Sequence, residues 1–208
     1  MERRVLRRRL AGMIALAATT ASAPAEAHLV STGIAPAYDG IVHFALTAGS
    51  VLPVMALALY AGLRGAPAAR GVLFTLPPSL FVGLYLGALT PAPLAGALDA
   101  RATAVSFLVL GVLLAADLRL PSMAITVIAG LLGLIRGGLD GVALASDGLG
   151  MGALLGEALA SFVLTALLSA GVLCLQVHWA RIGVRVAGSW LSALGLLLIG
   201  WMARGMAP

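Results

Sequence analysis

The 208-residue chain is 61% hydrophobic and only 10% charged, with a mean hydropathy of +1.07, whereas a soluble domain has about 25% charged residues. These values exclude a soluble globular domain and favour an all-α polytopic membrane bundle. All 13 basic residues are arginines and five of them lie in the first nine residues, so the sequence pI of 10.7 does not indicate a basic patch that binds nucleic acid.

The first 27 residues have the three parts of a cleavable secretory signal peptide. Arg3–Arg9 form the positive region, Leu10–Ala18 the apolar core, and Thr19–Ala27 the small-residue region, which ends in Ala25-Glu26-Ala27. The apolar core is about half the length that spans a bilayer. We therefore predict cleavage rather than a first transmembrane helix, and an extracytoplasmic segment over residues 28–40.

His28 lies in a chelating position under either of two cleavage sites. Cleavage after Ala27 makes His28 the new N-terminus, where its amine and imidazole can bind one metal ion. Cleavage after Ala25 places it third, where the amine, backbone nitrogens and imidazole form the square-planar site that Cu(II) or Ni(II) prefers. The alternative is an incidental histidine in a disordered leader.

Asp39 and His43 are the next candidate ligands. A helix is expected to begin near Pro36, since proline suits the first turn. Asp39 then lies near the helix N-terminus, where the dipole favours negative charge, and His43, four residues later, shares its face. The two could ligate a metal together, or Asp39 could orient the His43 ring. A first-turn acid beside an interfacial histidine is the plainer alternative.

Six hydrophobic spans are expected between residues 41 and 204. The third and fourth of them are short: at ~1.5 Å per residue, each reaches only about 22 Å of the roughly 30 Å hydrocarbon core. The signal peptide places the mature N-terminus outside a bacterial cytoplasmic membrane, and more arginines fall in the inside loops than outside, as expected. The expected spans are Ile41–Leu63, Gly71–Thr90, Ala102–Ala116, Pro121–Ile135, Gly148–Leu175 and Val186–Ala203.

Glu157 is the one ionisable residue well inside an expected span. An acid within the membrane is a candidate cation ligand or proton carrier. If the glycine-rich run from Gly148 to Gly152 is a loop, Glu157 instead lies at the outer interface as a solvated carboxylate or a partner for Arg136. Arg136 and Asp140 are expected to form an i,i+4 ion pair at the end of the fourth span.

No motif of an enzyme is present. Gly-x-Ser-x-Gly, His-Glu-x-x-His and Cys-x-x-Cys are all missing from the sequence, so hydrolase and thiol-redox functions have no support and we predict no enzyme. The single cysteine, Cys174, excludes an internal disulfide and is expected to be a small buried hydrophobe.

Four stretches are similar to the HupE/UreJ family of small membrane proteins: His28-Leu-Val-Ser-Thr-Gly, Tyr38-Asp39-Gly40 through His43, Leu52-Pro53-Val54, and Ala61-Gly62-Leu63-Arg64-Gly65. The resemblance implies a nickel permease or a metal-handling accessory protein of hydrogenase and urease gene clusters. Its implied partners are the lipid bilayer, a transition-metal cation and a metalloenzyme maturation or membrane complex.

What the resemblance implies for the site is a metal bound by His28, Asp39 and His43. Glu157, from its position inside a span, is added as a further polar group on the path of the cation. The cation is Ni²⁺, or alternatively Cu²⁺, Co²⁺ or Zn²⁺. Better-known members carry a His-Gly-x-x-His-Gly motif where this chain has Arg136-Gly-Gly-Leu-Asp140-Gly, and often a histidine where it has Ser169. A non-transporting accessory or scaffold protein is therefore the alternative function.

Overall fold

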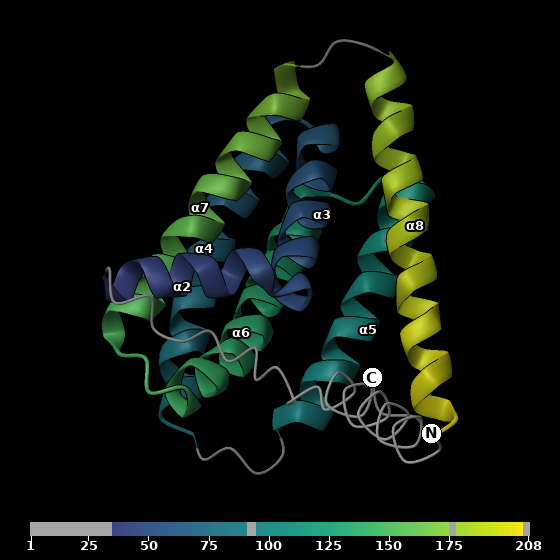
Figure 1. Cartoon of the computed structure of the whole chain (residues 1–208). Coiled ribbons are helices and arrows are strands. Elements are labelled where there is room, and N and C mark those ends of the chain that lie inside the picture. The colour runs from purple at the N-terminus through teal and green to yellow at the C-terminus, as the bar shows by residue number, and fades with distance from the viewer. Residues whose placement is uncertain (1–34, 91–94, 175–177, 206–208) are drawn as a thin grey trace, which may run out of the picture. The chain divides into compact units, whose positions relative to one another are not determined.

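The computed structural model describes residues 35–90, 95–174 and 178–205, and these residues form helices without any strand. The predicted signal peptide and His28 lie outside the described residues. The all-α prediction is confirmed. The helices, shown in Figure 1, are α2 (Pro36–Leu46), α3 (Ala48–Arg64), α4 (Ala66–Ala88), α5 (Ala95–Ala115), α6 (Ser122–Ser146), α7 (Met151–Cys174) and α8 (His178–Ala203).

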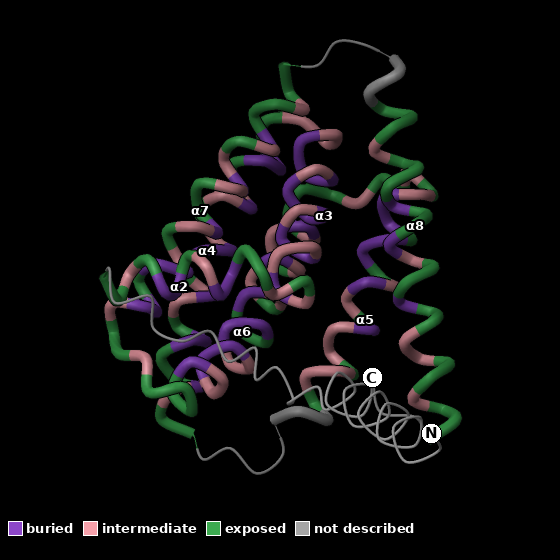
Figure 2. Tube along the Cα trace, viewed as in Figure 1, coloured by how far each residue is buried: buried purple, intermediate pink, exposed green. Residues whose placement is uncertain are grey.

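Five of these helices are long and apolar enough to cross a membrane, namely α4 to α8. The pair α2 and α3 supplies a sixth span if it is taken as one broken segment. Exposed residues follow the outer faces of the helices (Figure 2). Large apolar residues are among them, such as Trp190 at 71% and Leu167 at 67%. Such surfaces suit contact with lipid, so the prediction of a membrane helical bundle is confirmed.

The first span differs from its expected form. Ile41–Leu63 was expected to be one helix kinked at Pro53, but the chain breaks at Thr47, which has an extended backbone, and α2 and α3 meet at 76°. In Figure 1, α2 lies transverse to α3. The bend allows α2 to pack against α7, so the expected first span is broken into two helices and is not one continuous helix.

The fourth span is also longer than expected. The prediction that it ends at Ile135 is wrong, because α6 continues to Ser146 and so extends about 37 Å at 1.5 Å per residue. Glycines after Ile135 were read as the end of the helix, yet in a membrane small residues allow helices to approach closely. Arg136 is therefore inside the helix and buried, not at its end and reaching for the interface.

Glycines account for the contact between α4 and α6. A Cβ atom on Gly137 would overlap the carbonyl oxygen of Leu80, and one on Gly141 would overlap that of Leu84. In the other direction, a Cβ on Gly87 would overlap the carbonyl oxygen of Gly138. The two backbones thus touch along several turns, which fixes the position of α6 and of the polar side chains it carries.

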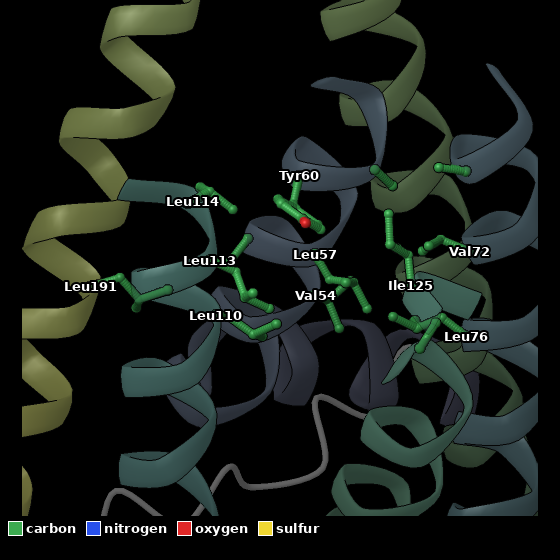
Figure 3. Packing of buried hydrophobic residues seen from close by; sticks show 14 of the residues in the cluster. Val54, Leu57, Tyr60, Val72, Leu76, Leu110, Leu113, Leu114, Ile125 and Leu191 are labelled. Atoms are coloured by element: carbon green, nitrogen blue, oxygen red, sulfur yellow. The ribbon is translucent and has the colours of Figure 1, made fainter. Parts of the chain in front are cut away.

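The apolar core is arranged around α3, as Figure 3 shows. Val54, Leu57 and Tyr60 of α3 lie between side chains of α5 on one side and side chains of α4 and α6 on the other. Labelled neighbours of α3 in Figure 3 are Leu110, Leu113 and Leu114 of α5, Val72 and Leu76 of α4, Ile125 of α6 and Leu191 of α8.

The prediction that Cys174 is a small buried residue is wrong. Cys174 is exposed and is the last residue of α7.

Candidate functional site

His43 and Glu157 form a buried pair between α2 and α7. His43 Nδ1 lies 3.3 Å from Glu157 Oε2, and the two side chains are 9% and 0% exposed. Glu157 is buried in the second turn of α7 and is not a solvated carboxylate, although α7 begins only at Met151 and the run from Gly148 to Gly150 lies outside the helix. A histidine and an acid separated by 114 positions in the sequence are thus brought into direct contact.

Close backbone contact between α2 and α7 makes this pairing possible. A Cβ on Gly40 would overlap the carbonyl oxygen of Ala153, and a Cβ on Gly156 would overlap that of Ala37. Any larger residue at either glycine would push α2 away from α7. Gly40 lies one turn before His43, and Gly156 immediately precedes Glu157, so the two contacts set the distance between imidazole and carboxylate.

Arg136 is the centre of a second buried group. Its Nη2 donates to Asp140 Oδ1 at 2.7 Å and to Ser50 Oγ at 3.0 Å, while its Nη1 donates to Asp99 Oδ1 at 2.7 Å and to Thr103 Oγ1 at 3.0 Å. The guanidinium thereby connects α3, α5 and α6. The expected ion pair with Asp140 is present, but at the middle of a helix and buried, with Asp99 as an additional partner that is 46% exposed.

Asp140 joins the two groups. Besides holding Arg136, it interacts with both Glu157 and His43. Asp140 Oδ2 and Glu157 Oε1 are buried oxygens without a hydrogen-bond partner among the described residues. A buried carboxylate oxygen without a partner costs about 1–3 kcal/mol, so this point of the network favours a proton or a cation that would bridge the two acids.

Three of the four predicted ligands lie among the described residues. Asp39 and His43 are both buried on α2, as expected for residues that share a face, and Glu157 contacts His43 directly. Within residues 35–90, 95–174 and 178–205, no three histidine, cysteine or acidic side chains converge as a ready-made metal site. His28 lies outside these ranges, so the proposed three-ligand set stays a prediction.

Sequence reasoning missed the wider network. Ser50 and Thr103 were not considered, Asp99 was not considered as a partner of Arg136, and Arg136 was interpreted as the partner of Asp140 at the end of a helix or as a partner of Glu157. The apolar residues that follow, Gly141-Val-Ala-Leu-Ala, were a signal that the helix continues beyond Asp140. An arginine with apolar helix on both sides must find acceptors inside the protein, which is what the structure shows.

Comparison with known protein families gives a match over most of the chain. The family model described as HupE / UreJ protein matches residues 16–198, a range that includes all of α2 to α7 and most of α8. No curated protein and no solved structure matches the chain.

Proposed function

Since the chain belongs to the HupE/UreJ family over residues 16–198, we propose that it binds a transition-metal cation within the membrane and transports it or passes it on. Ni²⁺ is the first candidate, with Co²⁺, Cu²⁺ and Zn²⁺ as alternatives, and the cation is the substrate. The observation that carries the proposal is the buried contact between His43 and Glu157, with Asp140 beside it.

The charges around this contact favour a cation. Asp99, Asp140 and Glu157 bring three carboxyl groups to the network, against the guanidinium of Arg136 and the His43 imidazole, which is charged only when protonated. An uncompensated carboxylate is costly to bury. A divalent cation beside Glu157 and Asp140 would neutralise the excess and give both unpartnered oxygens a ligand bond.

The donor atoms also suit a transition metal. Imidazole nitrogen is a common ligand of nickel, copper and zinc, and Glu157 supplies a carboxylate on the opposite helix. Further ligands are proposed from Asp39, one turn before His43, and from His28 on the segment before α2. On this proposal the mature N-terminus faces the outside of a bacterial cytoplasmic membrane, so that the segment with His28 meets the cation first.

Binding and uptake are tested with two variants of the pair and a matched control. We expect His43→Ala and Glu157→Gln to weaken ⁶³Ni²⁺ binding to the purified protein at least tenfold, with a parallel loss of uptake in cells. Ser161→Ala is the control, because Ser161 is buried on α7 one turn after Glu157 and its hydroxyl donates only to the Ala158 carbonyl in the described structure. Unchanged binding in both variants would place the metal elsewhere.

A non-transporting accessory or scaffold role is the second candidate. Arg136 lies where the family resemblance leads one to expect a histidine, and its guanidinium is fully buried and held by four oxygen atoms on α3, α5 and α6. Such a cross-link favours a static bundle that docks on a metalloenzyme maturation or membrane complex. Metal bound without uptake above that of a deletion strain would support this role. No enzymatic activity is proposed.

A further inference from the structure

A polar cavity of about 470 Å³ lies at the other end of the helices from the His43–Glu157 pair. On α3, Ser50 belongs to the Arg136 network and Arg64 lines the cavity, so the two sites are separated by about 21 Å along the helix axis. Among the residues that the structure describes, four arginines and a single acid, Asp117, line the cavity. The arginines are Arg64, Arg119, Arg181 and Arg185.

The connection between α5 and α6 holds one wall of the cavity in place. The Tyr60 hydroxyl donates to the Leu118 carbonyl at 2.6 Å and accepts from the Leu120 amide at 3.4 Å. Asp117 has a left-handed backbone, with φ of 51°, and pairs with Arg64. The arginine-bearing loop is therefore anchored to α3 by side-chain contacts, and Arg119 is presented at a fixed place.

The opposite wall comes from α8. Arg181 and Arg185 are one turn apart and share a face of that helix, and the Arg185 Nε donates to the Ala115 carbonyl at 3.1 Å. Because Asp117 can compensate only one of the four guanidinium groups, the cavity has an excess of positive charge. Arg64 Nε is buried and has no hydrogen-bond partner among the described residues.

Two helix N-termini add to the positive electrostatic potential in the cavity. Pro67 and Ala68 at the start of α4, and Ser122 at the start of α6, line the cavity. Neither helix has a side-chain cap at its N-terminus. The first-turn amides and the positive end of the helix dipole favour an anion at such a position, so arginines and helix ends reinforce each other.

We propose that this cavity binds the phosphate group of an anionic lipid head group. Arginine recognises phosphate oxygens through paired N–H donors, and basic pockets between membrane helices take phospholipid head groups. The cavity lies where α3 and α5 end and α4 and α6 begin, which is the depth at which head groups meet a spanning bundle. Free phosphate has the same chemistry and is the other source of this ligand. The proposal is independent of the metal site.

The test is binding of phosphatidylglycerol to the detergent-purified full chain by native mass spectrometry, with phosphatidylcholine as the zwitterionic reference. We expect at least a tenfold preference for phosphatidylglycerol in the natural sequence. The double variant R119Q/R181Q should lower this preference to less than threefold, whereas R119K/R181K should keep most of it. The matched control R101Q/R204Q removes two exposed arginines from α5 and from the chain just after α8, and should leave the preference unchanged.

Inorganic phosphate distinguishes the two sources. Displacement of the lipid by millimolar phosphate would identify a phosphate-binding cavity open to soluble anions, and lack of displacement would identify a head-group site; both support the proposal. Equal binding of the two lipids by the natural sequence would overturn it. So would a preference that survives R119Q/R181Q, or one that falls equally in R101Q/R204Q. Size-exclusion profiles of the variants separate loss of the site from loss of folding.

Discussion

Arg136 donates a hydrogen bond to Asp140, one turn further along α6, with 2.7 Å between Nη2 and Oδ1, and both side chains are buried. The same guanidinium holds side chains of α3 and α5. The pair is thus a structural junction of three helices, and Asp140 extends it to Glu157 and the proposed cation site.

Replacing Arg136 should destabilise the bundle strongly. Arg136→Gln removes the positive charge and leaves Asp140 as a buried acid without its cation, a change that costs about 3–5 kcal/mol where buried pairs are broken from one side. The free energy of unfolding in mixed detergent micelles measures this effect. Arg101→Gln is the control, because Arg101 is an exposed arginine on α5 and should change stability by less than about 0.5 kcal/mol.

A double-mutant cycle separates the pair from general damage. Asp140→Asn alone leaves the buried guanidinium with Asp99 as its remaining acidic partner, and in combination with Arg136→Gln it removes both charges at once. We expect the double variant to be more stable than the sum of the single effects predicts, by about 1–3 kcal/mol. Strict additivity would show that the contact contributes no coupling.

The fold class could be predicted from the sequence, whereas contacts between particular side chains of different helices could not. Composition and hydropathy predicted the all-α membrane bundle, because both depend on whether the helices are surrounded by lipid or by water and not on particular side-chain contacts. The pairing of His43 with Glu157 could not be predicted, since it depends on the bend at Thr47 and on glycines that bring α2 against α7. Both residues were nevertheless candidates, because burying an imidazole or a carboxyl group in apolar surroundings costs free energy unless the group has a partner or a ligand.

The error at α6 has a single physical origin. In water, Gly137 and Gly138 after an arginine indicate the end of a helix. In a membrane, the same glycines provide a surface on which α4 packs, and the cost in helix propensity is offset by that contact. Only the apolar residues that resume after Asp140 indicate, from the sequence alone, that the second rule applies here.

Gly137 and Gly138 offer a test of this interpretation at adjacent positions of α6. A Cβ on Gly137 would overlap the backbone of α4 at Leu80, whereas a Cβ on Gly138 would meet nothing within 4 Å. We expect Gly137→Ala to lower the free energy of unfolding by about 1–3 kcal/mol, and Gly138→Ala to be neutral or stabilising by up to about 1 kcal/mol. Equal effects at the two positions would contradict the tight packing of α4 on α6.

Gly156 and Gly171 form the corresponding comparison on α7. Ala37 of α2 contacts Gly156 through its carbonyl oxygen, and no atom lies near the place of a Cβ on Gly171. Gly156→Ala should push α2 outward, separate His43 from Glu157 and weaken Ni²⁺ binding, while Gly171→Ala should leave binding unchanged. Isothermal titration with Ni²⁺ measures both variants, and normal affinity in Gly156→Ala would mean that the contact with α2 does not set the site.

Tyr60 is expected to stabilise the loop between α5 and α6. Tyr60→Phe removes the donor to the Leu118 carbonyl and the acceptor of the Leu120 amide, which should cost about 1–3 kcal/mol because the ring is fully buried. Tyr85→Phe is the control, since Tyr85 is 45% exposed on α4. Unfolding in detergent gives the stabilities, and proteolysis of the loop gives a second readout.

The start of the mature protein is the last prediction, because it determines what His28 can do. The Ala25-Glu26-Ala27 pattern leads us to expect a mature N-terminus at His28, or at Glu26 if cleavage occurs after Ala25. Edman degradation of the protein purified from membranes identifies which of the two residues begins the mature protein. In both forms His28 is placed to chelate together with the mature amine or the backbone, so on our proposal His28→Gln should weaken Ni²⁺ binding, and acetylation of the mature amine should do the same. A chain that still begins at Met1 would contradict the signal peptide and leave the metal site to the residues of α2 and α7.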